Sequence, residues 1–206
     1  QFGTSFNALA AWLTGGKFCH VAIVFEIQNV DATYSYKEVS VVRTQDKAND
    51  VVRFQEVEDF SGWTCFRIQY TDPAAERRAY DWVNSTWVGK HYDRVGSIMD
   101  FTLCCWLPRG YRSLTGERDE DKNAKTYCSR LAIEVLQVCD QFTQHNPEKV
   151  NPNTIYRLIK QENQDTPGKW KDVTTIANSI LKDRSLQHPC FVPVQNGDGS
   201  KQYILF

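Results

Sequence analysis

Apolar and polar residues along the first third of the chain follow the short runs and two-residue alternation that are typical of β-strands. The run over residues 21–27 is apolar enough for burial on both faces of a sheet. Strand patterns continue over residues 33–42, 51–57 and 64–70, with polar turns between them. We therefore predict an antiparallel meander of about four strands in this region.

Beyond residue 70 the apolar spacing changes to the period of an amphipathic helix. Asp72-Pro73 predicts a helix start, because proline fits the first helical position and Asp72 or Thr71 can act as the cap. This helix is expected to continue to about Trp87, where Gly89 follows. Further helical patterns cover residues 4–13, 94–106 (a helix or a loop), 128–142 and 153–162, the last beginning at Asn151-Pro152.

The C-terminal part of the chain returns to strand patterns. Residues 170–173 predict a strand, and residues 192–194 with 203–206 predict a hairpin. Together the elements predict an α+β fold, in which an antiparallel sheet of about four to six strands packs against helices. The polar residues 108–125 predict an exposed loop.

Composition narrows the classes of function. Hydrophobic residues make up 41% of the 206 residues and charged residues 24%, which indicates one globular domain rather than a disordered chain. The net charge of −1 gives no general attraction to nucleic acid, so we expect no nucleic-acid partner. The apolar stretches are too short to cross a bilayer, and no signal-peptide pattern opens the chain, so we expect no transmembrane segment.

The chain has seven cysteines, at positions 19, 65, 104, 105, 128, 139 and 190. Their odd number, and the lack of a CxxC pair or a zinc-binding spacing, indicate free thiols in a reducing compartment. We therefore expect a cytoplasmic protein with no metal and no cofactor. Because the chain opens on Gln1, we also expect a fragment, a processed product or a trimmed chain.

Cys128 is the strongest candidate nucleophile, because it opens an amphipathic helix. The unpaired N–H groups and the positive dipole end of a helix N-terminus favour a thiolate, and they could also hold an oxyanion. Lys125 and Arg130 add positive charge nearby. The alternative is a structural cysteine at the start of a core helix, and the sequence leaves both interpretations open.

His20 is one of four histidines and opens the apolar run that continues to Phe25. At the end of a buried strand its ring could face a helix end and act as a general base, although a buried structural histidine is the usual alternative. His91 is the second candidate, in a segment whose glycine and charges indicate an exposed loop.

A third residue should orient the imidazole through its other nitrogen. Glu38, on the strand that follows the His20 strand, is the best-placed carboxylate. An ordinary solvent-facing strand residue is the other interpretation of Glu38. The side-chain amides that could replace it are those of Gln28, Gln45 and Gln55.

Four short segments occur in the order Phe18-Cys19-His20-Val21-Ala22-Ile23, Gly89-Lys90-His91-Tyr92-Asp93, Tyr127-Cys128-Ser129-Arg130-Leu131 and Val150-Asn151-Pro152-Asn153. This order resembles the circularly permuted NlpC-type papain-like superfamily, and more narrowly its YiiX-like branch, which includes poxviral and other viral or bacterial members. The resemblance implies a permuted papain-like fold, with residues 1–165 as the domain and 166–206 as an extension packed on it.

The resemblance also implies roles for individual residues. Cys128 would be the nucleophile, His20 the general base, and Glu38 the nearest match to a polar third residue. The candidate substrate-binding residues are Tyr92, Tyr127 and Ser129. Tyr92, together with Asp93, matches a motif that we interpret as structural support for the substrate groove.

The implied activity is that of a thiol peptidase or amidase acting on a peptide amide or an ester. A lipid acyltransferase or deacylase, as in the lecithin:retinol acyltransferase group, is the second possibility. A non-catalytic interaction module on the same fold, which could be viral, is the third. A viral member would act in the host cytoplasm.

Overall fold

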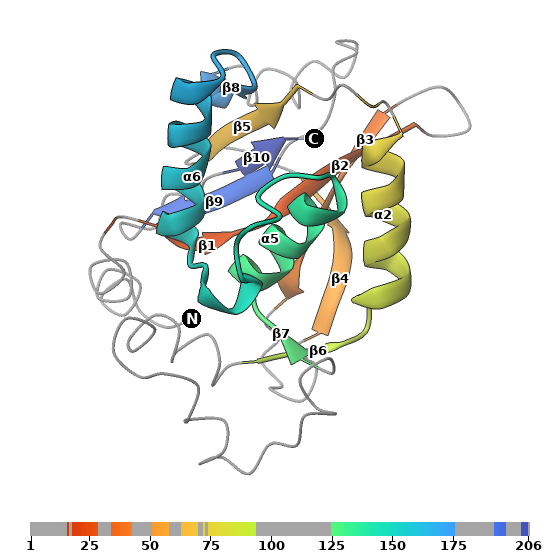
Figure 1. Cartoon of the computed structure of the whole chain (residues 1–206). Coiled ribbons are helices and arrows are strands. Elements are labelled where there is room, and N and C mark those ends of the chain that lie inside the picture. Colours follow the sequence, from red (N-terminus) through yellow and green to blue (C-terminus); the bar gives the residue numbers. More distant parts are fainter. Residues whose placement is uncertain are drawn as a thin grey trace, which may run out of the picture.

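The computed structural model describes residues 16, 18–28, 34–42, 51–57, 63–69, 72, 74–93, 125–175, 192–196 and 203–205 (Figure 1). Its strands are β1 (Phe18–Val21), β2 (Ile23–Gln28), β3 (Tyr34–Val42), β4 (Val51–Glu56), β5 (Thr64–Ile68), β6 (His91–Tyr92), β7 (Lys125–Thr126), β8 (Trp170–Asp172), β9 (Val192–Asn196) and β10 (Tyr203–Leu205). Its helices are α2 (Ala75–Thr86), α5 (Cys128–Val138), the 3₁₀ helix η3 (Pro147–Lys149) and α6 (Pro152–Asp165).

The strands form one sheet in the order β1-β9-β5-β10-β2-β3-β4-β6-β7, with β8 paired to β5. β2, β3 and β4 are consecutive antiparallel neighbours, which confirms the predicted meander for these strands. The next strand along the chain, β5, is not beside β4. It lies on the other side of β2, separated from β2 by β10, which runs parallel to both. The apolar pattern identified β2 to β5 since it reports burial, but burial does not specify a neighbour. It did not identify the two-residue strands β6 and β7, which lie where loops were predicted.

The last described strands occupy the middle of the sheet. β9 pairs antiparallel with β1 and β5, and β10 pairs parallel with β2 and β5. Both strands were predicted, but the hairpin between them was wrong, because each pairs with strands from the first third of the chain. The extension over residues 166–206 therefore contributes strands to the sheet of the predicted domain.

Side chains from α2, α5 and α6 build the core with the sheet. Phe25 of β2 contacts Phe54 of β4 and Tyr80 of α2, with ring centroids 6.0 and 5.5 Å apart. α5 lies between α2 and α6 and packs on both and on β1 (Figure 1). Most of its residues are buried, including Leu131 and Ile133, so neighbouring elements enclose most of this helix. The predicted α+β class is confirmed.

The helix boundaries follow local chemistry. Asn151 caps α6 as predicted: its side chain accepts a hydrogen bond from the Thr154 N–H at 2.9 Å, and Pro152 is the first helical residue. The predicted helix over residues 128–142 ends at Val138, because Asp140 has a φ of 59° that a right-handed helix cannot continue through.

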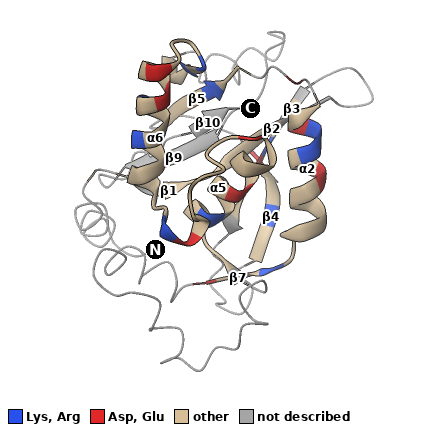
Figure 2. Cartoon of the chain, in the orientation of Figure 1, with Lys and Arg blue, Asp and Glu red and all other residues tan. Residues whose placement is uncertain are grey.

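The start of α2 differs from the prediction. Its N-cap is Ala74, which has no side chain able to cap, and the helix begins at Ala75. Asp72 lies ahead of the cap and accepts a hydrogen bond from the Ala74 N–H at 2.8 Å. Charges of both signs follow one another along α2 (Figure 2), and Arg77 pairs with Asp81 at 3.0 Å.

The predicted helices over residues 4–13 and 94–106, and the predicted loop up to residue 124, lie outside the described residues. None of the helices in the described ranges is both long enough and apolar enough to cross a bilayer.

Candidate functional site

Cys128 is the first residue of α5. The N-cap residue Tyr127 has an extended backbone, with φ −133° and ψ 167°, so the chain turns from β7 into the helix at the cysteine. The first N–H groups of a helix have no partner within the helix and carry its positive dipole end. Cys128 therefore lies where local backbone polarity favours a thiolate and can hold an oxyanion.

His20 lies on β1, the strand against which α5 packs. Figure 1 shows α5 next to this strand. The imidazole is half-buried, and it makes a T-shaped contact with the ring of Trp63, with the centroids 6.4 Å apart. The fold thus makes neighbours of the helix that begins with Cys128 and the strand that carries His20, although 108 positions separate the two residues (128 − 20).

Cys128 is itself largely enclosed. Its exposed fraction is 4%, and it belongs to the same hydrophobic core as Leu131 and Ala132 of its own helix. Two other cysteines in the described part of the chain, Cys65 and Cys139, are also buried. An enclosed thiol can be stabilised by packing alone, so burial supports the structural interpretation of Cys128 as well as the catalytic one.

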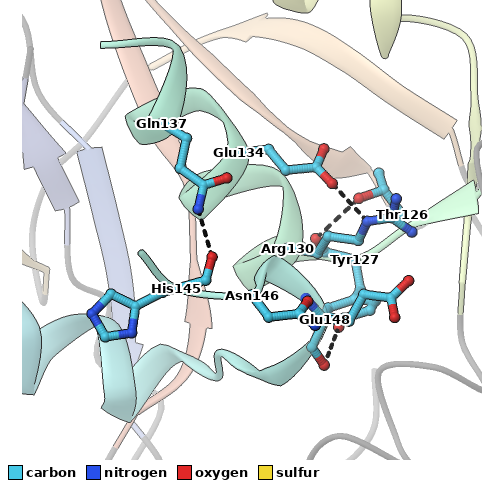
Figure 3. A network of polar contacts seen from close by, with 8 residues as sticks. All are labelled: Thr126, Tyr127, Arg130, Glu134, Gln137, His145, Asn146 and Glu148. Carbon is cyan, nitrogen blue, oxygen red and sulfur yellow. Dashed lines mark hydrogen bonds and ion pairs between the residues drawn. The ribbon is translucent and has the colours of Figure 1, made fainter. Parts of the chain in front are cut away.

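Arg130 has a different role from the one expected from the sequence. Its Nε donates to Glu134 Oε1 at 2.8 Å, one turn further along α5 (Figure 3), and the two side chains are only 8% and 15% exposed. The guanidinium also lies 5.3 Å from the centroid of the Trp87 ring. Because Glu134 neutralises it, Arg130 anchors α5 against the end of α2 rather than supplying an unpaired positive charge beside Cys128.

Tyr127 and Ser129, the neighbours of Cys128, are each 1% exposed. The Tyr127 hydroxyl donates to the backbone carbonyl of Glu148 at 3.2 Å (Figure 3). This bond ties η3 to the start of α5. The roles of Tyr127 and Ser129 in substrate binding stay predictions. The hydrogen bond to Glu148 gives Tyr127 a structural role that does not depend on a substrate.

The segment over residues 89–93 supports the strand that leads to Cys128. Tyr92 of β6 pairs in parallel with Thr126 of β7, and the Asp93 N–H donates to the Thr126 carbonyl at 2.7 Å. Asp93 is buried. His91, the second candidate base, is exposed and lies opposite Lys125 in the same pair of strands. These contacts hold the segment against the strand that leads to Cys128, and the role of Tyr92 and Asp93 at a substrate groove stays a prediction.

Glu38 is buried on β3, where it lies opposite Val24 of β2. Its carboxylate accepts a hydrogen bond from Gln55 Nε2 at 3.2 Å. Val24 is four residues beyond His20 in the chain (24 − 20), a separation of about 13 Å along an extended strand. The register therefore does not place Glu38 beside His20, and its orienting role stays a prediction.

One residue that the sequence did not single out contacts β1, the strand that carries His20. Asn153 lies in the first turn of α6, and its side chain binds both backbone polar groups of Phe18 in β1. The Asn151-Pro152-Asn153 run could have indicated this contact. Asn151 alone is enough to cap the helix, so the second asparagine, Asn153, is not needed for capping.

In the described ranges, no group of three or more histidine, cysteine or acidic side chains is arranged to hold a metal ion. No protein-family model, curated protein or solved structure matches the chain.

Proposed function

We propose that the chain is a cysteine-dependent hydrolase that cleaves an amide or an ester, with Cys128 as the nucleophile and His20 as the general base. The observation that supports this is the meeting of four short segments. α5 begins with Cys128 and packs on β1, which carries His20. The segment over residues 89–93 binds the strand that leads to Cys128, and Asn153 binds β1.

The reaction follows from the groups at the site. His20 accepts the thiol proton of Cys128, and the sulfur attacks the carbonyl carbon to form a C–S bond. The N–H groups at the start of α5 stabilise the negative oxygen that develops. The imidazolium then donates its proton to the leaving amine or alkoxide as the C–N or C–O bond breaks.

Water completes the cycle. His20 takes a proton from a water molecule, which attacks the thioester, and the thiol is restored as the carboxylic acid leaves. An amine or alcohol in place of water would make the same thioester the donor in acyl transfer. A peptide amide is the first expected substrate, because the motif order resembles that of thiol peptidases and amidases.

A second candidate is a non-catalytic module in which Cys128 is a core residue. The specific observation in its favour is the 4% exposure of Cys128 and its place in the hydrophobic core. In this case Cys128 would react with alkylating reagents no faster than the buried Cys65 and Cys139.

Selective alkylation tests the proposal. The folded chain is treated with iodoacetamide between pH 5 and pH 9, and the rate at each cysteine is followed by mass spectrometry. We expect Cys128 to react fastest, and His20→Ala to slow it by about 10²- to 10⁴-fold at pH 7, as loss of a general base does. His91→Ala is the matched control, since His91 is exposed and lies on another strand.

An activity measurement completes the test. With para-nitrophenyl acetate as the ester probe, Cys128→Ser should abolish turnover while the melting temperature stays within a few degrees of that of the unchanged chain. Equal alkylation rates at Cys128, Cys65 and Cys139, with no effect of His20→Ala, would instead establish the structural role.

A further inference from the structure

β1 is held by a side chain at the residue where its own sheet pairing is irregular. Asn153 Oδ1 accepts a hydrogen bond from the Phe18 N–H at 3.0 Å, and Asn153 Nδ2 donates to the Phe18 carbonyl at 2.9 Å. Asn153 is 4% exposed. A buried amide that satisfies both polar groups of one strand residue takes the place of a neighbouring strand at that point.

Gly16 leaves the space for this amide. A Cβ atom at position 16 would lie 2.1 Å from Asn153 Oδ1 and 2.5 Å from its Cγ. Any larger residue would push the amide away from Phe18, so the contact depends on glycine at this position. The Asn153–Phe18 contact therefore depends both on the asparagine in α6 and on the glycine at position 16.

The pairing between β1 and β9 slips between this anchor and His20. Phe18 lies opposite Asn196, whereas His20 lies opposite Gln195, so β1 advances by two residues while β9 advances by one. A bulge of this kind bends the strand and changes the direction of the side chains next to it. His20 follows the bulge directly, and Asn153 holds the residue that precedes it.

We infer that Asn153 is a positioning residue that sets the direction of the His20 ring through the backbone of Phe18. This inference rests on the proposed function. Asn153 contacts the backbone on one side of the bulge, and the bulge transmits that position to His20. Without the amide, Phe18 loses a donor and an acceptor, and the imidazole loses the fixed geometry that proton transfer from Cys128 requires.

Two variants disturb the contact in different ways. Asn153→Ala removes the amide, and Gly16→Ala keeps the amide but displaces it. Asn151→Ala is the matched control: Asn151 lies two residues from Asn153 at the same helix start, and its side chain caps α6 by accepting a hydrogen bond from Thr154. All three variants are expected to lower the melting temperature.

The pH dependence of Cys128 alkylation separates positioning from simple destabilisation. We expect Asn153→Ala and Gly16→Ala to slow alkylation about 10- to 100-fold at pH 7, the effect of a displacement of about 1 Å at a reacting group, and to move the profile toward that of His20→Ala. Asn151→Ala should leave the profile unchanged. The double variant at positions 16 and 153 should add little to either single change.

A nuclear Overhauser effect between the His20 and Trp63 rings, whose centroids are 6.4 Å apart, reports ring direction independently of reactivity. It should weaken in Asn153→Ala and Gly16→Ala and persist in Asn151→Ala. The inference that Asn153 positions His20 is wrong if Asn153→Ala matches Asn151→Ala in both the pH profile of alkylation and the ring signal. If Asn153→Ala does not fold, Gly16→Ala decides in the same way.

The proposed function fails separately. If His20→Ala leaves the alkylation profile of Cys128 unchanged, the cysteine and histidine do not act together, and the hydrolase proposal is wrong. The ring signal then still decides the structural part of the inference. Its loss in the Asn153 and Gly16 variants, but not in the Asn151 variant, would show that the amide sets the His20 direction in a protein with another function.

Discussion

At the scale of single residues, Arg130 and Glu134 have the spacing of a surface ion pair but are buried in the fold. Their spacing of four positions is that of an ordinary exposed helix pair. Burial makes it different, since both charges are removed from most of the solvent and the guanidinium packs against the Trp87 ring. The stability of such a pair depends on keeping both partners.

Arg130→Met tests this dependence. Removing the cation leaves the Glu134 carboxylate enclosed and unpaired, so we expect a loss of about 3–5 kcal/mol in the free energy of unfolding, measured in urea. The double change Arg130→Met with Glu134→Leu should recover most of that loss, because no charge is left unpaired. A double variant as unstable as the single one would contradict this account.

At the scale of elements, α2 obtains its N-terminal support from outside the helix. Asp72 accepts from the Ala74 N–H and pairs with Arg78. The Arg78 side chain, followed by the Ala74 N–H, lowers the pKa of Asp72 from its ordinary value of 3.8. Because the group is exposed, this support is modest and is reduced by salt.

The sign of the pH effect follows from that direction. A carboxylate whose pKa is lowered by folding stabilises the folded state above its unfolded pKa, and this contribution is lost as the pH falls through the folded pKa. Asp72→Asn should therefore lower the melting temperature slightly at pH 6 and have little effect near pH 2. An equal effect at both pH values would mean that the Asp72 charge does not support α2.

Local patterns were sufficient for the elements but not for their assembly. The helix start at Cys128, the strand of His20 and the cap at Asn151 were predicted because each depends on residues within a few positions. The Asn153–Phe18 contact joins residues 135 positions apart. The bulge beside it depends on a strand near the end of the chain, so periodicity carries no information about either.

At the scale of the whole molecule, the sheet depends on its C-terminal strands. β9 is the neighbour of β1, and β10 separates β2 from β5. Removal of residues 176–206 would leave backbone groups of β1, β2 and β5 unpaired in positions that are otherwise buried, which is costly and exposes strand edges.

We therefore expect the chain truncated after residue 175 to lose cooperative unfolding and to associate. Circular dichroism during a thermal scan and size-exclusion chromatography would measure both. Removing only residue 206, which follows β10, is the control and should change neither. A truncated chain that remains monomeric and melts cooperatively would show that residues 176–206 are dispensable for the sheet.

The position of β9 and β10 in the chain, after the strands that they pair with, has a consequence for biosynthesis. Domains often fold from the N-terminus while the ribosome is still elongating the chain. Here β1 and β5 are translated well before β9, the strand that pairs with both. The strand that carries His20 therefore lacks its β9 neighbour until β9 has left the ribosome, and the sheet around His20 can be completed only then.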